Sequence, residues 1–372
     1  MSSHNSTQKW LLSVPALAGA SEAVHWFIDG LDASQPAGLA VLVWLGWLLF
    51  QAYEKVRFIP RVRAQRGLTL WAHVNWVLSF LVLYPSYYLL APLAGARWFG
   101  WIEPEFSLAW GPWLLLAGAL VGPFAWLVGY LLEAPARLLE FTLACPPDRQ
   151  PLKLLFISDL HLGNLLPESR LDWVLSVCQE RKPDALLIGG DLVDHDSVQL
   201  AAHQAWFRDL VALLPVYAVL GNHDIVAGRQ QIQGYLEAWG VTVLRDQVAQ
   251  LPGGWTLVGA LDIDFEQDCA QSLLGLPKEA GAILLSHNPD LLKQLPVDSL
   301  AKVALCLSGH THGGQIRLPW IGPILHPADR RFVPGLTQLE GLPPALVSQG
   351  LGYTLIPMRW DCPAEAIWLE WT

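Results

Sequence analysis

The sequence predicts two parts of different fold class: an all-α transmembrane helical region over residues 1–132 and a layered α/β domain over residues 152–372. Long runs without Asp, Glu, Lys or Arg predict the first part. In the second, short apolar runs alternate with helix-like segments such as 168–180 and 198–213, which is typical of α/β domains. The composition also changes near residue 140, because 11 of the 19 Trp residues precede Leu132.

Three uncharged runs, 35–53, 68–93 and 106–132, are candidate membrane spans. Each reaches the roughly 18 residues that a helix needs to cross a bilayer. Flanking Trp, Tyr and Arg favour lipid over the alternative, a buried helix of a soluble domain. A weaker fourth candidate, 10–28, is interrupted by Glu22 and His25, and its Ala18-Gly19-Ala20 stretch also fits a signal-peptidase site. That segment is therefore either an uncleaved helix or a cleaved signal.

The loops between these runs predict the orientation. Residues 54–67 carry five Lys and Arg residues, whereas residues 94–107 carry one Arg and two Glu. Because basic loops stay in the cytoplasm, the span that ends near residue 132 delivers the chain to the cytoplasmic side. Residues 133–151, with four prolines, are predicted as a juxtamembrane linker. Within it, residues 136–143 either lie on the bilayer surface or serve as a spacer.

The C-terminal part is acidic and contains four of the five cysteines; the fifth, Cys145, lies in the predicted linker. From residue 151 onward, 14 Lys and Arg residues stand against 24 Asp and Glu residues, a formal charge of −10. Such a domain is a poor partner for nucleic acid, and none is expected. The cysteines lack C-x-x-C spacing, so they are predicted to be buried thiols in a reducing compartment.

Polar clusters follow five apolar runs of this domain, 154–157, 185–188, 216–220, 282–285 and 303–307. The clusters are Asp159-Leu160-His161, Gly190-Asp191, Gly221-Asn222-His223-Asp224, Ser286-His287-Asn288 and Gly309-His310-Thr311-His312-Gly313-Gly314-Gln315. Ligands of an open α/β sheet bind outside the carboxyl ends of its strands, so the clusters predict one metal site built from five segments. Taken singly, each cluster also fits a helix cap or a turn.

The ordered series of five clusters resembles the calcineurin-like metallophosphoesterases over residues 152–372. Its Gly-His-Thr-His-Gly-Gly-Gln ending, with Pro357, Arg359 and the segment 363–365, is similar to a bacterial membrane-associated branch of that family. The resemblance implies a four-layer αββα sandwich. The resemblance also implies a bacterial inner (cytoplasmic) membrane location, and the basic loop over residues 54–67 predicts that the catalytic domain lies on the cytoplasmic side.

The resemblance implies two divalent metal ions per chain with a shared carboxylate. The implied ligands of the first metal are Asp159, His161, Asp191 and His312. The implied ligands of the second are Asp191, Asn222, His287 and His310. Imidazole combined with carboxylate and amide oxygen favours Mn, Fe or Zn over an all-oxygen Mg or Ca site.

Two catalytic side chains and two substrate contacts complete the expected site. His223 is expected to protonate the leaving oxygen or to stabilise the transition state, with Asp224 orienting its ring. Arg330 and Arg331 are candidate phosphate contacts, because guanidinium is a bidentate donor; a solvated surface is the alternative.

Paired metals activate water and clamp phosphoryl oxygens during in-line displacement, so we expect a phosphoesterase. The predicted spans favour a lipid-linked phosphodiester or pyrophosphate as substrate, since the resembling branch includes enzymes that split the pyrophosphate of UDP-2,3-diacylglucosamine in lipid A assembly. The candidates for contact with acyl chains, or equally for packing, are Leu162, Leu165, Leu166, Trp320 and Ile321. One alternative is an enzyme for soluble phosphoesters, and another is a non-enzymatic sensor or transporter with a metal-binding regulatory domain.

Overall fold

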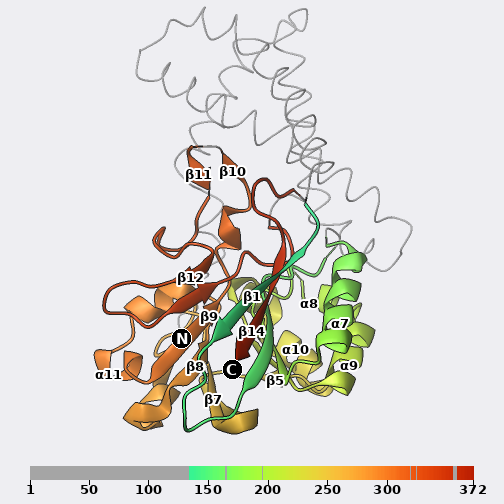
Figure 1. The fold of residues 1–372 in the computed structure, drawn as a ribbon. Coiled ribbons are helices and arrows are strands. Elements are labelled where there is room, and N and C mark those ends of the chain that lie inside the picture. The colour runs from blue at the N-terminus through green and yellow to red at the C-terminus, as the bar shows by residue number, and fades with distance from the viewer. Residues whose placement is uncertain (1–133, 164–165, 195, 319, 324, 355–357) are drawn as a thin grey trace, which may run out of the picture. The chain divides into compact units, whose positions relative to one another are not determined.

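The computed structural model describes residues 134–163, 166–194, 196–318, 320–323, 325–354 and 358–372 (Figure 1). Residues 129–372 form one compact unit. The four candidate membrane spans lie outside the described residues. Among the residues that are described, no helix combines the length and the hydropathy needed to cross a membrane.

A first sheet of six strands has the order β1-β14-β2-β3-β4-β5. The strands are β1 (Arg137–Leu143), β14 (Glu365–Trp371), β2 (Leu152–Ile157), β3 (Ala185–Gly189), β4 (Val216–Val219) and β5 (Thr242–Val243). Strands β2 to β5 are parallel, β14 is antiparallel to β2, and β1 is parallel to β14. The central strands read as continuous apolar runs because both faces of the sheet are covered.

A second sheet of six strands has the order β12-β13-β9-β8-β7-β6. The strands are β12 (Gly335–Thr337), β13 (Ala345–Val347), β9 (Val303–Ser308), β8 (Ala282–Leu285), β7 (Trp255–Gly259) and β6 (Gln247–Leu251). The four inner strands are parallel, and both edge strands are antiparallel to their neighbours. A separate hairpin joins β10 (Arg317–Leu318) to β11 (Gly322–Pro323) and extends beyond the sheets in Figure 1.

Helices cover the outer faces of the two sheets. Beside the first sheet lie α7 (Glu168–Arg181), α8 (Ser197–Ala201), α9 (Gln204–Leu213) and α10 (Asn222–Ala238), which Figure 1 shows together on one side. Short helices accompany the second sheet: η5 (Pro252–Gly254), η6 (Gln271–Gly275), η7 (Lys278–Ala280), η8 (Pro289–Lys293), α11 (Val297–Leu300) and η9 (His312–Gly314). The mixed α/β fold is therefore confirmed. The predicted helix over 198–213 is divided into α8 and α9.

The main core lies between the two sheets. Leu154 and Phe156 of β2 point into it and meet Leu257, Leu285 and Leu307 of the second sheet. The alternate β2 residues point the other way, into the cluster formed with the helices. This period-two division follows from strand geometry, in which successive side chains face opposite sides. All five apolar runs that precede the polar clusters form strands, so the clusters lie at strand ends.

Strand β1 lies inside the segment that the sequence predicts as a linker. It pairs with β14 along its whole length, and its Leu139 and Phe141 pack against the inter-sheet core. At its start, Arg137 Nη2 donates to Glu365 Oε2 at 3.0 Å. Glu365 is fully buried and also accepts from the backbone N–H of Gln349 at 3.0 Å. The structure thus differs from the prediction: residues 137–143 belong to the first sheet.

The Arg137–Glu365 pair provides a test of this placement. Arg137→Ala should lower the free energy of unfolding by about 1 to 2 kcal/mol, because the buried Glu365 carboxylate loses a donor. Arg181→Ala is the matched control, since Arg181 pairs with Glu140 of the same strand and both of those side chains are about half exposed. Its effect should stay within about 0.5 kcal/mol. Denaturant unfolding of the purified protein measures both; equal effects would argue against a structural role for β1.

Candidate metal centre

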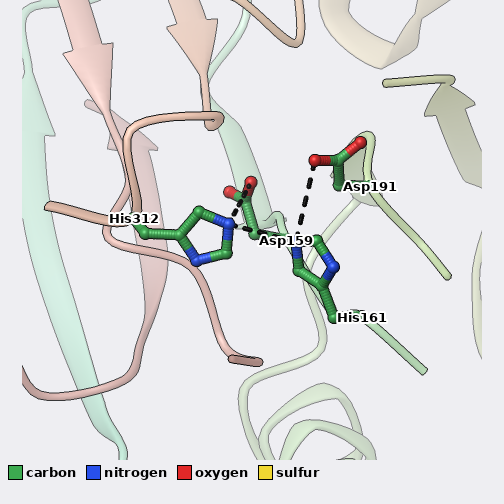
Figure 2. A group of neighbouring side chains, drawn as sticks. All are labelled: Asp159, His161, Asp191 and His312. Atoms are coloured by element: carbon green, nitrogen blue, oxygen red, sulfur yellow. Dashed lines mark hydrogen bonds and ion pairs between the residues drawn. The ribbon is translucent and has the colours of Figure 1, made fainter. Parts of the chain in front are cut away.

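Four predicted ligands from three strand ends meet in one buried cluster (Figure 2). Asp159 and His161 follow β2, Asp191 follows β3, and His312 follows β9. Nε2 of His312 lies 3.0 Å from Nε2 of His161 and 3.4 Å from Oδ1 of Asp159. Nε2 of His161 lies 3.7 Å from Oδ2 of Asp191. The donor atoms thus converge on one point. We call the edge of the two sheets at which this cluster lies the metal edge.

A second cluster lies on the other side of Asp191. Oδ2 of Asp191 is 3.2 Å from Nε2 of His287, which follows β8. Oδ1 of Asn222, at the start of α10, is 3.0 Å from that nitrogen and 3.1 Å from Nδ1 of His310. These four residues are the predicted ligands of the second metal. Asp191 alone belongs to both clusters, as a bridging carboxylate would.

The backbone at the clusters is unusual and explains the neighbouring glycines. The left-handed region, with φ between 44° and 65°, is occupied by five predicted ligands: Asp159, His161, Asp191, His310 and His312. Such a conformation costs a non-glycine residue about 1 kcal/mol or more, and clusters of it occur at functional sites. Glycines let the loops approach closely. A Cβ on Gly221 would collide with Asp191, and one on Gly309 would collide with Asp159.

The buried ligands of the two clusters differ in their pKa shifts. Burial raises the pKa of Asp191, but the nearby His287 outweighs burial and holds that pKa well below its usual value. Burial and the charge of His287 lower the pKa of His310 to about 3, and burial with the charge of His161 lowers that of His312 well below its usual value. Asp191 is then an anion, and His310 and His312 are neutral, which are the forms that coordinate a metal. The charge of Asp191, against the effect of burial, raises the pKa of His287 well above its usual value, so a metal that binds there must displace the proton of His287.

The donor set fits two divalent ions. Each cluster combines imidazole nitrogens with carboxylate oxygen, and the second adds the amide oxygen of Asn222. This mixture suits Mn, Fe or Zn. Without cations, burial raises the pKa of Asp159 despite the neighbouring imidazoles, whereas ions at the donor atoms would stabilise its charged form.

Asp194, rather than Asp224, holds the ring of His223. Nδ1 of His223 lies 2.8 Å from the Asp194 carbonyl oxygen and 3.6 Å from its carboxylate. The same carboxylate lies 3.2 Å from Nδ1 of His161. The two histidine rings meet edge to face, with centroids 4.8 Å apart. His223 therefore lies directly beside the first cluster, and Asp194, not the expected Asp224, contacts its ring.

Asp224 instead connects two segments of the chain that carry predicted metal ligands. It is fully buried, and its Oδ2 accepts from the backbone N–H of Gly221 at 3.0 Å, at the start of α10. Its Oδ1 accepts from the N–H groups of Leu192 and Val193 at 2.9 and 3.1 Å. Burial raises its pKa to about 7. The carboxyl group thus fixes the loop that carries Asp191 against the helix that carries Asn222.

The two candidate phosphate contacts lie on the surface. Arg330 and Arg331 are both exposed. Arg331 donates to Asp329 at 2.7 Å, and Asp329 also binds Lys293 at 3.1 Å. Arg331 thus forms a surface ion pair, which agrees with the alternative prediction of a solvated surface position. A phosphate contact for either arginine stays a prediction.

The sequence analysis did not predict Asp194, which contacts the site, or Asp262, a buried acid whose charge interacts with that of His287. Asp194 lies three residues after the ligand Asp191, and that spacing was the available signal. Asp262 follows β7. Of the four inner strands of the second sheet, β7 and the short β13 are the two to which no site residue was assigned. Asp262 is buried, and burial raises its pKa to about 6 although the charge of His287 opposes this. Its position after an apolar strand was a signal of the same kind.

The glycine contacts predict a difference between two positions next to and within α10. Gly221→Ala should strip most of the bound metal, because its Cβ would collide with Asp191 and come within 2.8 Å of His287. Gly234→Ala is the matched control, since nothing lies within 4 Å of a Cβ there. It should keep the metal and raise helix stability by about 0.5 to 1 kcal/mol. Elemental analysis of the purified variants measures the metal; equal content in both would contradict the close approach at Gly221.

Comparison with known proteins agrees with this geometry. Residues 152–314 match the calcineurin-like phosphoesterase family. The chain is 34% identical to phosphodiesterase YaeI of Escherichia coli, over 59% of this chain and 82% of that protein. It is 33% identical to the uncharacterized metallophosphoesterase YkuE of Bacillus subtilis, over 68% of this chain and 89% of that protein.

A third relative, an uncharacterized metallophosphoesterase of Helicobacter pylori, is 30% identical over 59% of this chain. The match spans only 59% of that relative's own length. The extent of the match to YaeI and YkuE, the family match and the buried histidine and aspartate clusters all point the same way. The chain belongs to the calcineurin-like metallophosphoesterases.

Proposed function

We propose that this protein is a dinuclear-metal phosphoesterase that hydrolyses a phosphodiester or pyrophosphate bond. The observation that carries the proposal is the place of Asp191 in both ligand clusters, because a shared carboxylate sets two cations a few ångströms apart. The name of YaeI, a phosphodiesterase, supports the bond class. The family membership argues against the non-enzymatic alternative.

When bound, two divalent ions activate water and neutralise charge on the phosphoryl oxygens. The residues of this chain then hold the reacting groups in place and determine which nitrogen transfers the proton. The Asp194 carbonyl accepts a hydrogen bond from Nδ1 of His223, so this nitrogen carries a proton. In its protonated form the ring also carries a proton on Nε2, which is the proton it can give to the leaving oxygen. Asp194 thereby sets which nitrogen exchanges its proton.

We further propose that the enzyme is anchored in a bacterial inner membrane and faces the cytoplasm. The support is sequence-based: the uncharged runs within residues 35–132 and the basic loop over residues 54–67. An anchored hydrolase gains most from a substrate that also partitions into the bilayer. The finer proposal is therefore a lipid-linked phosphoester, such as UDP-2,3-diacylglucosamine.

Phosphorus NMR of the purified, Mn-loaded protein in detergent tests bond class and substrate together. The substrates are UDP-2,3-diacylglucosamine and the soluble ester bis-p-nitrophenyl phosphate. Release of UMP and lipid phosphate supports the lipid-linked substrate. Cleavage of the soluble ester alone keeps the phosphoesterase and removes the lipid proposal. Cleavage of neither, in protein with verified metal, contradicts this substrate range.

Two substitutions separate metal binding from proton transfer. Asp191→Ala should abolish both metal loading and turnover, because it removes the shared ligand. His223→Ala should keep both metals and slow turnover by roughly 10² or more. His203→Ala is the control. His203 lies in the helical layer, where its Nδ1 is hydrogen-bonded to the carbonyl oxygen of Gln199 in α8. Turnover and metal content are measured together; full activity of His223→Ala would remove its assigned role.

A further inference from the structure

The chain enters the described domain at the metal edge. Strand β1 is parallel to β14, and β14 is antiparallel to β2. The amino end of β1 therefore lies beside the carboxyl end of β2, where the ligands begin. Arg137 pairs with Glu365, whose backbone N–H bonds the Gly350 carbonyl at 3.1 Å. A Cβ on Gly350 would lie 2.7 Å from Asp159, so this entry point is close to the first ligand.

Exposed aromatic side chains gather at the same edge. Among the described residues, the exposed Phe and Trp side chains are Phe265, Trp320 and Trp360. Phe265 follows the carboxyl end of β7, Trp320 lies in the β10–β11 hairpin, and Trp360 lies between β13 and β14. All three segments follow the carboxyl ends of inner parallel strands, which meet at the metal edge. Such an uneven distribution marks an interaction surface rather than scattered surface residues.

The β10–β11 hairpin presents the most exposed apolar group of this surface. Trp320 is fully exposed and Ile321 is 72% exposed, with Leu318 and Leu325 at 39% and 60%. We call these four side chains the hairpin tip. Trp320 is in the left-handed region at φ 63°, which a bulky residue rarely adopts. Packing within the domain does not explain them, whereas Leu162 and Leu166 near the first ligands are buried in the core.

Hydrogen bonds connect the hairpin to the loop that carries His312. The N–H of Arg317 donates to the Trp360 carbonyl, and the N–H of Trp360 donates to the Gln315 carbonyl, both at 3.0 Å. The Gln315 side chain exchanges two hydrogen bonds with the backbone of Thr354, at 2.8 and 2.9 Å. Whatever the hairpin tip binds is therefore held at a fixed place relative to the metal ligands.

The chemistry of this surface fits a lipid bilayer better than a protein. Trp at a protruding tip with Arg at its base is the composition of segments that rest in a membrane interface, and Arg317 occupies that base. The chain that joins this edge comes from the segment predicted to cross the bilayer. Residues 151–372 carry a formal charge of −10, so the bulk field would repel an anionic membrane and docking must be apolar.

We propose that the hairpin tip inserts into the bilayer that anchors this chain and holds the metal edge at the level of the lipid headgroups. The inference rests on the proposed membrane anchoring and deepens it, because it states which face of the domain meets the lipid. A phosphoester at headgroup level then reaches the metals without leaving the membrane.

Fluorescence quenching by lipids tests the docking. Full-length Ile321→Cys is labelled with the dye NBD and reconstituted into vesicles whose acyl chains carry a nitroxide quencher near the headgroup. The control is Val297→Cys, because Val297 in α11 is 80% exposed and lies beside the amino end of β9, opposite the metal edge. Four of the five native cysteines are buried and Cys145 is half-buried, so labelled wild type gives the background.

The dye at position 321 should lose roughly half of its fluorescence or more, as a probe about 5 to 10 Å deep would, and the dye at 297 should lose little. The quenching should persist in high salt, because the contact is apolar. Equal quenching at both positions overturns the proposal. A shielded but unquenched dye at 321 also overturns it, since another part of the protein would then cover the tip.

A second variant connects docking to catalysis. Trp320→Ser with Ile321→Ser should reduce hydrolysis of a vesicle-borne phosphoester about tenfold, from the loss of buried apolar area. It should leave hydrolysis of bis-p-nitrophenyl phosphate unchanged, which also shows that the variant folds. Equal rates with wild type on both substrates contradict the docking. If wild type hydrolyses neither substrate, the proposed function fails, while the quenching measurement still decides the docking.

Discussion

The site depends on a buried carboxylate, Asp191, that stands between two groups of histidines. Its Oδ2 lies 3.2 Å from Nε2 of His287 and 3.7 Å from Nε2 of His161. A buried anion is costly unless positive charge compensates it, and here two clusters of nitrogen donors surround it. Much of the surrounding structure serves this one group: the glycines that admit it, the left-handed turns that aim its neighbours and the Asp224 bridge that fixes its loop.

The location of the site could be predicted because it follows from the parallel direction of the strands. Each apolar run ends in a polar cluster, and parallel strands bring those ends to one edge whatever the details of packing. Asp159, His161, Asp191, Asn222, His287, His310 and His312 therefore lie where the sequence predicts, in two groups that share Asp191. The mixed α/β fold follows from the same alternation of strands and helices.

Features that depend on backbone geometry could not be predicted in this way. Asp194 orients His223 through its backbone carbonyl oxygen, so its spacing from Asp191 marks its position but not the contact that it makes. Asp224 looked suitable because it follows His223, but its carboxylate turns back to the backbone N–H groups at the start of α10. The segment of β1 was predicted as a linker because prolines flank it, and its partner β14 lies more than 220 residues later in the chain.

The direction of the strands also connects chemistry with location. The edge that holds the ligands is the edge at which the chain enters the domain and at which Trp320 and Ile321 protrude. The proposed docking relies on apolar contact and a tether, because an acidic domain gains little from the field of a membrane. The hairpin, fastened to the Gln315 loop, would transmit that contact to the metal ligands.

Anomalous X-ray diffraction from Mn-loaded crystals tests the central claim, that two metals share Asp191, most directly. The account predicts two manganese peaks per chain about 3.5 to 4 Å apart, with one carboxylate oxygen or both of Asp191 between them. One peak should adjoin His161 and His312, and the other His287 and His310. A single peak, or two peaks that do not share Asp191, would contradict the account.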